Sequence, residues 1–484
     1  MNVDEAMRPG RRGLFVAGEW RDSLDDARFT VHDPATGQAI ADVADATPED
    51  GLAALATAEA ARPAWAASAP RRRSEILRRA FEAMLARTDA LAELLVRENG
   101  KPLAEARGEV AYAAEFLRWY SEEAVRIDGS IATAPGGAHR IVVVRKPVGT
   151  ALLVTPWNFP AAMVTRKVAP ALAAGCCVVL KPATETPLTA LALAGLLAEA
   201  GVPPGVLTVL PTTRNAEVVS AMLADLRVRK LSFTGSTEVG RLLLAGAAAR
   251  VLPCSMELGG NAPFVVFADA DLDAVVEGFL LAKMRNNAQA CTAANRILVE
   301  EPVMEDFSRR IVRAMKALRV GPGMEPGVQF GPLVDAAGRD KVDRLVGAAA
   351  RAGARILCGG SVPEGAGFFY PPTVLADVAP DSPILREEIF GPVAPLVAFR
   401  DEAEAIRLAN ATEHGLAAYV WSRDLGRAMR VGEAIESGMV GINRGMVSDP
   451  AAPFGGVKQS GLGREGGHEG LLEFTEQRYL AVEW

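Results

Sequence analysis

Cysteine and histidine are scarce in this sequence of 484 residues, and their spacing excludes several kinds of site. An odd number of cysteines without a C-x-x-C pair fits neither a disulfide framework nor a zinc ribbon. The zinc-binding motif H-E-x-x-H is absent, because His468-Glu469 is not followed by a second histidine four residues after the first. Neither a G-x-S-x-G elbow nor a G-x-x-x-x-G-K-[ST] loop occurs, which argues against α/β-hydrolases and P-loop NTPases. The five cysteines are Cys176, Cys177, Cys254, Cys291 and Cys358.

The sequence also lacks an excess of basic residues and a long apolar segment. Lysine and arginine number 52 against 59 acidic residues, so we expect neither nucleic acid nor a membrane as a partner. Residues 1–22 contain no apolar core of a secretory signal, and the apolar stretch 188–200 is too short to span a bilayer. The length predicts about three domains, and the unpaired cysteines favour a reducing, cytoplasmic location.

Strands and helices alternate along most of the chain. Two helices are expected over 48–99, broken near Pro70, and a third over 101–128, before a β-branched run at 140–145. Short apolar strands at 151–154, 176–180, 206–210, 230–233 and 252–256 then alternate with helices, which predicts a doubly wound parallel sheet. A second alternating series runs from 263–267 to 438–442, and the glycine pair at 259–260 marks the boundary between the two.

Two glycine-containing segments resemble phosphate-binding turns. Residues 461–466 match G-x-G-x-x-G, but no strand precedes them and only 18 residues follow, so a glycine-rich loop is the better interpretation. Residues 233–240 follow the strand at 230–233 and open a helix over 237–248. A helix N-terminus of this kind presents free N–H groups to phosphate, although Ser236 or Thr237 as a simple N-cap explains the pattern equally well.

Three reactive side chains lie at the ends of predicted elements. Cys291 is in a polar loop between a helix and the strand at 296–299, where it is either a nucleophile or a packing residue. Glu257 ends the strand at 252–256, as a general base or a turn residue. Asn158 follows the strand at 151–154, as an oxyanion donor or a helix N-cap.

Seven motifs in order make the sequence similar to the aldehyde dehydrogenase superfamily over nearly the whole chain, and within it to the succinate-semialdehyde dehydrogenases. The motifs are TPWNFP (155–160), KPATETP (181–187), FTGSTEVG (233–240), ELGGN (257–261), NAQACTAANR (287–296), EEIFGP (387–392) and PFGGVKQSGLGREGG (453–467).

The resemblance implies the α/β aldehyde dehydrogenase fold and a homodimer or homotetramer. A doubly wound cofactor-binding domain is expected over 1–127 and 147–258, and an α/β catalytic domain over 259–447. Residues 128–146 and 468–484 would form a small β oligomerisation arm, and 448–467 would return to the cofactor-binding domain.

The resemblance also assigns the chemistry. Cys291 would attack the aldehyde carbon to give a thiohemiacetal and then a thioester, with the oxyanion held by Asn158 and the Cys291 N–H. Glu257 would activate water for hydrolysis. Because relatives that acylate coenzyme A usually lack this glutamate, its presence disfavours that alternative, and the intact trio disfavours a non-catalytic relative. No metal is expected.

The resemblance identifies the cofactor as NADP or NAD. NAD-preferring relatives commonly carry glutamate three residues after the lysine that faces the adenosine ribose. Here Lys181 is followed at that spacing by Thr184, with Glu185 one place later, which favours NADP because a carboxylate would repel a 2′-phosphate. The implied cofactor-binding residues are Trp157, Lys181, Ala183, Thr184, Gly235, Ser236, Leu258, Glu388 and Phe390.

The implied substrate is a small aldehyde with a distal carboxylate, first of all succinate semialdehyde. Arg166 and Arg285 match arginines that bind such a carboxylate, and Ser448 adds a hydrogen bond. The alternative for each arginine is a salt bridge with a neighbouring acid. Glutarate semialdehyde or a plain aliphatic aldehyde remains the alternative substrate.

Overall fold

An eight-stranded sheet organises the first half of the chain in the computed structural model, which describes residues 9–483. Its four central pairings, β9-β8-β7-β10-β11, are parallel, and antiparallel strands close both edges. In sheet order the strands are β2 (Glu19–Arg21), β1 (Leu14–Val16), β9 (Leu207–Val209), β8 (Cys177–Lys181), β7 (Thr150–Val154), β10 (Val228–Thr234), β11 (Cys254–Glu257) and β21 (Gly461–Leu462).

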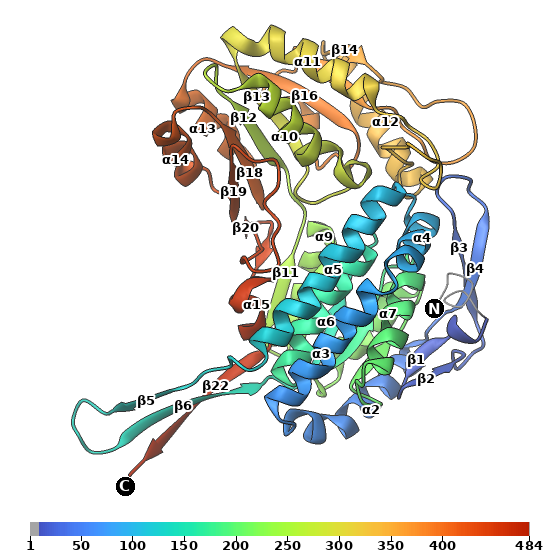
Figure 1. The fold of residues 1–484 in the computed structure, drawn as a ribbon, viewed down its shortest axis with the longest axis vertical. Helices are drawn as coiled ribbons and strands as arrows, with labels where there is room; N and C mark the ends of the chain where they lie inside the picture. Colours follow the sequence, from blue (N-terminus) through green and yellow to red (C-terminus); the bar gives the residue numbers. More distant parts are fainter. Residues whose placement is uncertain (1–8, 484) are drawn as a thin grey trace.

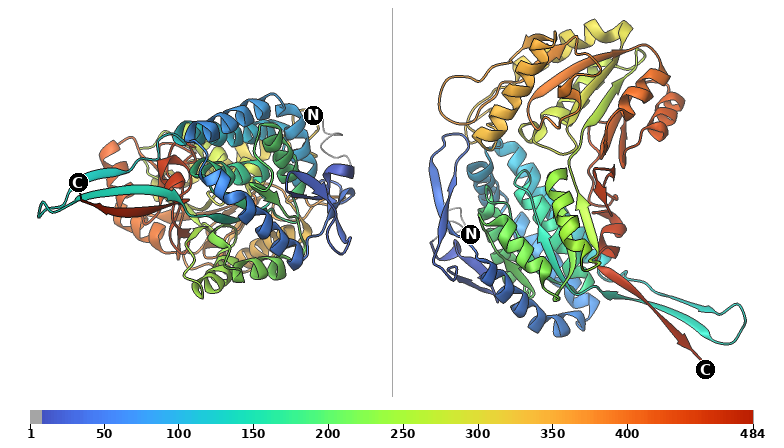
Figure 2. Two further views of the ribbon diagram at one scale, coloured as in Figure 1. Left: turned by 90° about the horizontal axis from the view of Figure 1, so that it is seen from below. Right: turned by 180° about the vertical axis from the view of Figure 1, so that it is seen from behind.

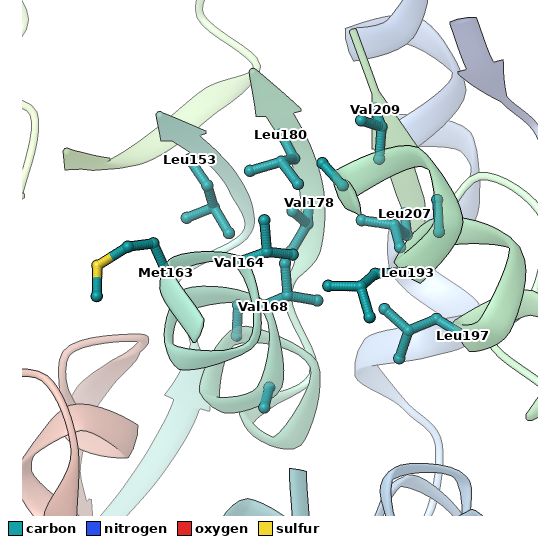
Figure 3. Packing of buried hydrophobic residues seen from close by; sticks show 14 of the residues in the cluster. Leu153, Met163, Val164, Val168, Val178, Leu180, Leu193, Leu197, Leu207 and Val209 are labelled. Carbon is teal, nitrogen blue, oxygen red and sulfur yellow. The ribbon is translucent and has the colours of Figure 1, made fainter. Parts of the chain in front are cut away.

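Helices cover both faces of this sheet, as predicted (Figures 1 and 2). Strands β7 and β8 are buried along their whole length, which explains their unbroken apolar sequences. Figure 3 shows Val164 and Val168 of one helix and Leu193 of the next packed against Val178 and Leu180. The helices after each strand are α6 (Pro160–Ala174), α7 (Pro187–Glu199), α8 (Asn215–Ala224) and α9 (Thr237–Ala248).

Three helices, not two, occupy residues 48–99. The predicted break at Pro70 is present, but a second break follows at Ala86–Arg87, where neither proline nor glycine signals it. Thr47 begins the first helix with a capping box, and Gly100 ends the third in the left-handed conformation. The helices are α2 (Pro48–Ala66), α3 (Pro70–Leu85), α4 (Thr88–Asn99) and then α5 (Leu103–Glu123).

A seven-stranded sheet organises the second half of the chain, with a separate pair of apolar cores. It is parallel except for the edge strand β14, which pairs antiparallel with a strand that the sequence reading missed, β15. The strands in order are β14 (Arg355–Cys358), β15 (Thr373–Ala376), β16 (Val393–Phe399), β13 (Ala294–Glu300), β12 (Ala262–Val266), β18 (Ala417–Trp421) and β19 (Met439–Ile442). The helices are α10 (Leu272–Met284), α11 (Met304–Ala317), α12 (Ala336–Arg351), α13 (Glu402–Asn410) and α14 (Leu425–Ala434).

A three-stranded antiparallel arm projects from the body of the molecule, with the C-terminus at its end (Figures 1 and 2). Its strands are β5 (Ser130–Thr133), β6 (Arg140–Pro147) and β22 (Thr475–Val482). The remaining short elements are β3 (Arg28–His32), β4 (Ala39–Ala44), β17 (His414–Gly415), β20 (Val457–Lys458), α15 (Gly467–Leu472), η1 (Pro9–Arg11), η2 (Arg285–Ala288), η3 (Glu301–Val303) and η4 (Pro383–Leu385).

The sequence analysis predicts neither a membrane-spanning segment nor a secretory signal at the N-terminus. Within residues 9–483, no helix combines the length and the apolar character needed to cross a bilayer. The prediction about a signal segment concerns residues 1–22, of which residues 1–8 lie outside the described residues. Trp484, the last residue of the expected arm, also lies outside them.

Candidate active site

Two adjoining cavities form one cleft at the carboxyl ends of the strands of the first sheet. The smaller cavity, of about 370 Å³, contains Asn158, Glu257 and Cys291. The larger cavity, of about 1060 Å³, extends over α8 and α9. Both are lined by Trp157 and by the turn before α9, so they are continuous. All nine predicted cofactor residues line this cleft: Trp157, Lys181, Ala183, Thr184, Gly235, Ser236, Leu258, Glu388 and Phe390.

The predicted catalytic trio comes from three separate segments. Asn158 lies between β7 and α6, Glu257 ends β11, and Cys291 lies between η2 and β13. The Asn158 amide Nδ2 donates to the Gln289 carbonyl at 3.0 Å, which leaves its second N–H for another acceptor. Gly260 is required where the chain passes this loop, because a Cβ there would lie 2.2 Å from the Cys291 carbonyl oxygen.

The turn before Cys291 is a left-handed one. Asn286, Asn287 and Ala288 have φ values of +58°, +54° and +58°, a conformation that costs an alanine about 1–2 kcal/mol. Asparagine side chains hold the turn: Asn286 Nδ2 donates to the Asn158 carbonyl at 2.8 Å, and Asn287 Nδ2 donates to the Pro332 carbonyl at 2.9 Å. Strain of this kind is typical of functional sites. The two adjacent asparagines are the signal that would have predicted it.

Burial suppresses the ionised forms of both reactive groups. It raises the pKa of the Cys291 thiol to about 12, although the Arg166 charge acts in the opposite direction. Burial also raises the pKa of Glu257 well above its ordinary value, and the Glu465 carboxylate adds to this rise, against Lys167 and Arg166. Neither carboxyl oxygen of Glu257 has a hydrogen-bond partner among residues 9–483. The ionised form of this carboxyl group therefore increases only as the pH rises above the ordinary carboxyl range.

Lys167 and Glu465 form a buried pair beside Glu257, and the sequence reading had singled out neither. Lys167 Nζ donates to Glu465 Oε1 at 2.5 Å and to the Ser232 hydroxyl at 2.9 Å. The two residues are 298 positions apart in the chain. No local pattern joins them, because Glu465 lies in the glycine-rich segment after β21.

The turn before α9 is interpreted from the sequence either as a phosphate-binding helix N-terminus or as a simple N-cap, and its geometry is compatible with both. Ser236 is the N-cap, and its hydroxyl accepts from the Val239 N–H at 3.3 Å. The same turn lines both cavities. Across the cleft, the half-buried Glu388 carboxylate accepts from the Gly260 N–H at 3.0 Å, and the ring of Phe390 meets that of Trp157 edge to face at 5.4 Å.

Lys181 and Thr184 lie together at the far end of the larger cavity. Lys181 donates to the Asn215 side-chain oxygen, and Asn215 Nδ2 donates to the Thr184 hydroxyl at 3.3 Å. Burial lowers the pKa of Lys181 to about 8, and the Glu185 carboxylate opposes that shift. Glu185, which its sequence spacing had set aside, also lines this cavity. The structure therefore adds Asn215 and Glu185 to the residues of this end.

A third cavity, of about 600 Å³, lies on the other side of the Asn158–Phe159 turn. Arg285 and Ser448 line it, together with Tyr112 and Phe159. The Arg285 guanidinium lies 5.1 Å from the Phe159 ring, and no carboxylate of residues 9–483 forms an ion pair with it. Two of the three predicted substrate residues thus share one cavity.

Arg166 is placed differently. Only 2% of it is exposed, and none of the cavities described above has it on its wall. Its guanidinium carbon lies 4.1 Å from the Phe454 ring and 5.2 Å from the Phe116 ring. Glu465 Oε2 approaches Arg166 Nη1 to 3.7 Å, so the salt bridge that was the alternative for this residue is present.

The chain belongs to the aldehyde dehydrogenase family, whose profile matches residues 20–480. It is 57% identical over 443 residues to a succinate-semialdehyde dehydrogenase of Paenarthrobacter nicotinovorans, covering 92% of this chain and 98% of that one. It is 48% identical to a glutarate-semialdehyde dehydrogenase of Pseudomonas putida, covering 98% of each. A crystal structure of an Escherichia coli NADP-dependent enzyme superposes with a TM-score of 0.97 at 46% identity, covering 99% of each chain. The predicted family and fold are confirmed.

Proposed function

We propose that this aldehyde dehydrogenase oxidises succinate semialdehyde to succinate, with NADP as the preferred cofactor and NAD also usable. The observation that carries the proposal is the cavity with Arg285 and Ser448, next to the Asn158 turn and across it from the cofactor cleft. Arg285 forms no ion pair among residues 9–483, although Glu105 on the same wall lies within reach of its charge, and the planar donors of a guanidinium can bind the two oxygens of a carboxylate ligand at once. The likeness to a succinate-semialdehyde dehydrogenase supports the same substrate.

The proposed chemistry uses three residues. The Cys291 sulfur, after losing its proton, bonds to the aldehyde carbon, and the oxyanion accepts from the Asn158 amide and the Cys291 N–H. When bound, the nicotinamide ring accepts the hydride from that carbon. Glu257 then takes a proton from water, whose oxygen attacks the thioester carbon. The carbon–sulfur bond breaks, succinate leaves and the thiolate is restored.

The cleft fits a dinucleotide in shape and in donors. Ser236 and the N-terminus of α9 offer N–H groups to a pyrophosphate, and the Glu388 carboxylate retains an oxygen free to accept from a ribose hydroxyl. The apolar side of α9 would cover the adenine ring. Lys181 would hold the 2′-phosphate through its ammonium group, and Thr184, whose hydroxyl donates to the Thr212 carbonyl at 2.8 Å, places no negative charge beside it.

A glutamate at position 184 tests this cofactor assignment. In Thr184→Glu, a negatively charged carboxylate replaces a neutral hydroxyl near the 2′ position, so we expect the KM for NADP to rise at least about tenfold while the KM for NAD changes little. The measurement is steady-state kinetics with each cofactor at saturating aldehyde. Thr208→Val, which removes a buried hydroxyl that has no hydrogen-bond partner among residues 9–483 and lies outside the cleft, is the control. An unchanged ratio of the two KM values would place the 2′ group elsewhere.

A small panel of aldehydes tests the proposed substrate. We expect kcat/KM to be highest for succinate semialdehyde, lower for glutarate semialdehyde and at least about tenfold lower for butyraldehyde, which has no carboxylate to meet Arg285. The assay follows NADPH or NADH formation with each aldehyde, with and without coenzyme A. Equal values for butyraldehyde would contradict the proposal, and a requirement for coenzyme A would contradict hydrolysis.

The arm and the division into domains are also proposals. We propose that 128–146 and 468–484 join subunits in a homodimer or homotetramer. Exposed Ile131, Tyr479 and Leu480 on the arm support this. A cofactor-binding domain over 1–127 and 147–258, with return segment 448–467, and a catalytic domain over 259–447 accord with the two sheets and their separate cores. The five free cysteines support a reducing, cytoplasmic location.

A further inference from the structure

We propose that Lys101 is a positioning residue for the oxidation: together with Glu109 it holds the turn that carries Asn158, so that the Asn158 amide is aimed at the oxyanion. Lys101 lines none of the three cavities described above, so it would act through Asn158 without touching the aldehyde or the cofactor. The inference rests on the proposed function, in which Asn158 holds the oxyanion. Neither Lys101 nor Glu109 is among the site residues that the sequence predicts.

Lys101 lies between α4 and α5, and its ammonium group is fully buried. Its Nζ donates to a Glu109 carboxylate oxygen and, at 2.9 Å, to the backbone carbonyl of Asn158. The same carbonyl accepts from Asn286 Nδ2 at 2.8 Å. Because Asn286 belongs to the turn before Cys291, this one carbonyl oxygen joins the Asn158 turn both to the nucleophile loop and to the junction of α4 and α5.

Glu109 holds the other side of the same turn, at the start of α6. This helix has Phe159 at its N-cap and receives no capping hydrogen bond from that side chain, although the first N–H groups of a helix need acceptors from outside it. Glu109 Oε1 supplies one, since it accepts from the Ala161 and Ala162 N–H groups at 2.8 and 3.2 Å. The pair therefore fixes the backbone both before and after Phe159.

The Asn158 amide has little else to orient it. Its Nδ2 donates to the Gln289 carbonyl at 3.0 Å, and its Oδ1 has no hydrogen-bond partner among residues 9–483. The backbone of the turn must therefore set the direction of the second N–H. A hydrogen bond weakens steeply as its angle becomes less linear, so a small rotation of the turn would reduce donation to the oxyanion.

The Lys101–Glu109 ion pair suits a positioning role better than a stabilising one. Each side chain is only 1% exposed, and in such a pair the cost of desolvation offsets much of the attraction between the charges. Its charge-assisted hydrogen bonds still fix where their partners lie. Burial lowers the pKa of Lys101, and the Glu109 carboxylate opposes that shift, so the carboxylate favours the charged ammonium.

The test replaces Lys101 with methionine, which keeps the length of the side chain and removes its donors. We expect the rate constant of NADPH formation in the first turnover to fall by about tenfold or more, since an oxyanion donor is worth about 10²–10³ and a displaced donor loses part of that. The loss should be the same for succinate semialdehyde and butyraldehyde, because every aldehyde forms the oxyanion.

Two further measurements on Lys101→Met separate lost positioning from general damage to the site. Alkylation of Cys291 by iodoacetamide, followed by mass spectrometry of its peptide, forms no oxyanion and should keep its rate. The Kd for NADPH, measured by fluorescence titration, should also be unchanged. A loss of alkylation rate as large as the loss in the first turnover would overturn the proposal.

A double-mutant cycle with Asn158→Ala shows whether Lys101 acts through Asn158. In that background the Lys101→Met substitution should slow the first turnover by less than about twofold, because the donor that Lys101 positions is already absent. Losses that multiply in the double variant would mean that the two residues act independently, and they would overturn the proposal.

A second variant covers the possibility that Lys101→Met does not fold, since it leaves the Glu109 carboxylate buried without its cation. Lys101→Met/Glu109→Gln removes both charges and keeps a side-chain oxygen for the N–H groups of α6. Because Glu109 also lines the third cavity, this variant is compared with butyraldehyde, which has no carboxylate. We expect the same slow first turnover as in Lys101→Met.

Lys230→Met is the matched control. Lys230 is also buried, donates to the Glu473 carboxylate at 2.7 Å and lines none of the three cavities. Its removal likewise leaves a carboxylate without its cation, but we expect no change in the first-turnover rate constant. An equal loss in Lys230→Met and Lys101→Met would overturn the proposal, because it would reflect lost stability alone.

The outcomes distinguish this inference from the proposed function. If Asn158→Ala leaves the first turnover unchanged, the proposed function fails at its oxyanion step and the role of Lys101 fails with it. If Asn158→Ala slows the first turnover but neither variant of Lys101 does, the proposed function stands and the role of Lys101 is overturned.

Discussion

Replacing Cys291 with alanine is expected to reduce NAD(P)H formation by at least about 10⁴-fold, because removal of a nucleophile eliminates the covalent route. The measurement is steady-state production of the reduced cofactor with saturating aldehyde. Cys254→Ala is the matched control, since Cys254 is half-buried at the start of β11 and lines none of the three cavities. Substantial activity in Cys291→Ala would exclude the thioester mechanism.

In the proposed mechanism, the hydrolysis of the thioester depends on Glu257. In Glu257→Gln the glutamine cannot take a proton from water, so rapid mixing should show a first-turnover burst followed by turnover slowed by roughly 10²–10⁴-fold. Because burial raises the pKa of Glu257, its ionised form increases as the pH rises above the ordinary carboxyl range. The steady-state rate of the unmodified enzyme should therefore rise with pH, and the variant should lose that dependence. Full steady-state activity in Glu257→Gln would remove this residue from the mechanism.

Replacing Arg285 with alanine is expected to change substrate preference more than any other substitution outside the catalytic trio. A hydrogen bond to a charged group contributes about 1.5–3 kcal/mol. Its loss should lower kcat/KM for succinate semialdehyde by roughly 10- to 100-fold more than that for butyraldehyde. The measurement compares both aldehydes at saturating NADP. Arg285 forms no ion pair among residues 9–483, but burial raises the pKa of Glu105 on the same cavity wall and the Arg285 charge opposes this rise, so the substitution should raise that pKa further without breaking an ion pair.

Arg319→Ala provides a surface control for this experiment. Arg319 is exposed, pairs with Glu325 and lies outside the substrate cavity. Its removal should leave the preference for succinate semialdehyde unchanged. If Arg285→Ala lowers kcat/KM for the two aldehydes equally, the carboxylate assignment loses its physical basis, and only the general aldehyde dehydrogenase activity remains.

Most of the fold could be predicted because its strands and helices have local signatures. The buried parallel strands β7, β8 and β12 appear as short apolar runs, and the helices between them begin or end at proline or glycine. The break between α3 and α4 could not be predicted, because Ala86 and Arg87 are both compatible with a helix. The edge strand β14 was expected, but its antiparallel direction depends on β15, which the sequence analysis missed.

The sequence by itself determined the class of protein, through motifs that resemble one family. Asn158, Glu257 and Cys291 each lie in a motif next to a strand end, and a parallel fold brings such ends together in one cleft. The residues that the family resemblance implied for the cofactor all line the same cleft.

Only the tertiary structure decided which charges are paired and which side chains reach a cavity. Arg166 and Glu465 are 299 positions apart, and Arg166 and Tyr112 are 54 apart, so no spacing rule connects them. The path of the chain buries Arg166 against Tyr112 and Glu465, and it places Arg285 on a cavity wall beside Glu105, with which it interacts without forming an ion pair. Two arginines that look equivalent in the sequence therefore have different surroundings, because burial and pairing are set by contacts between distant segments.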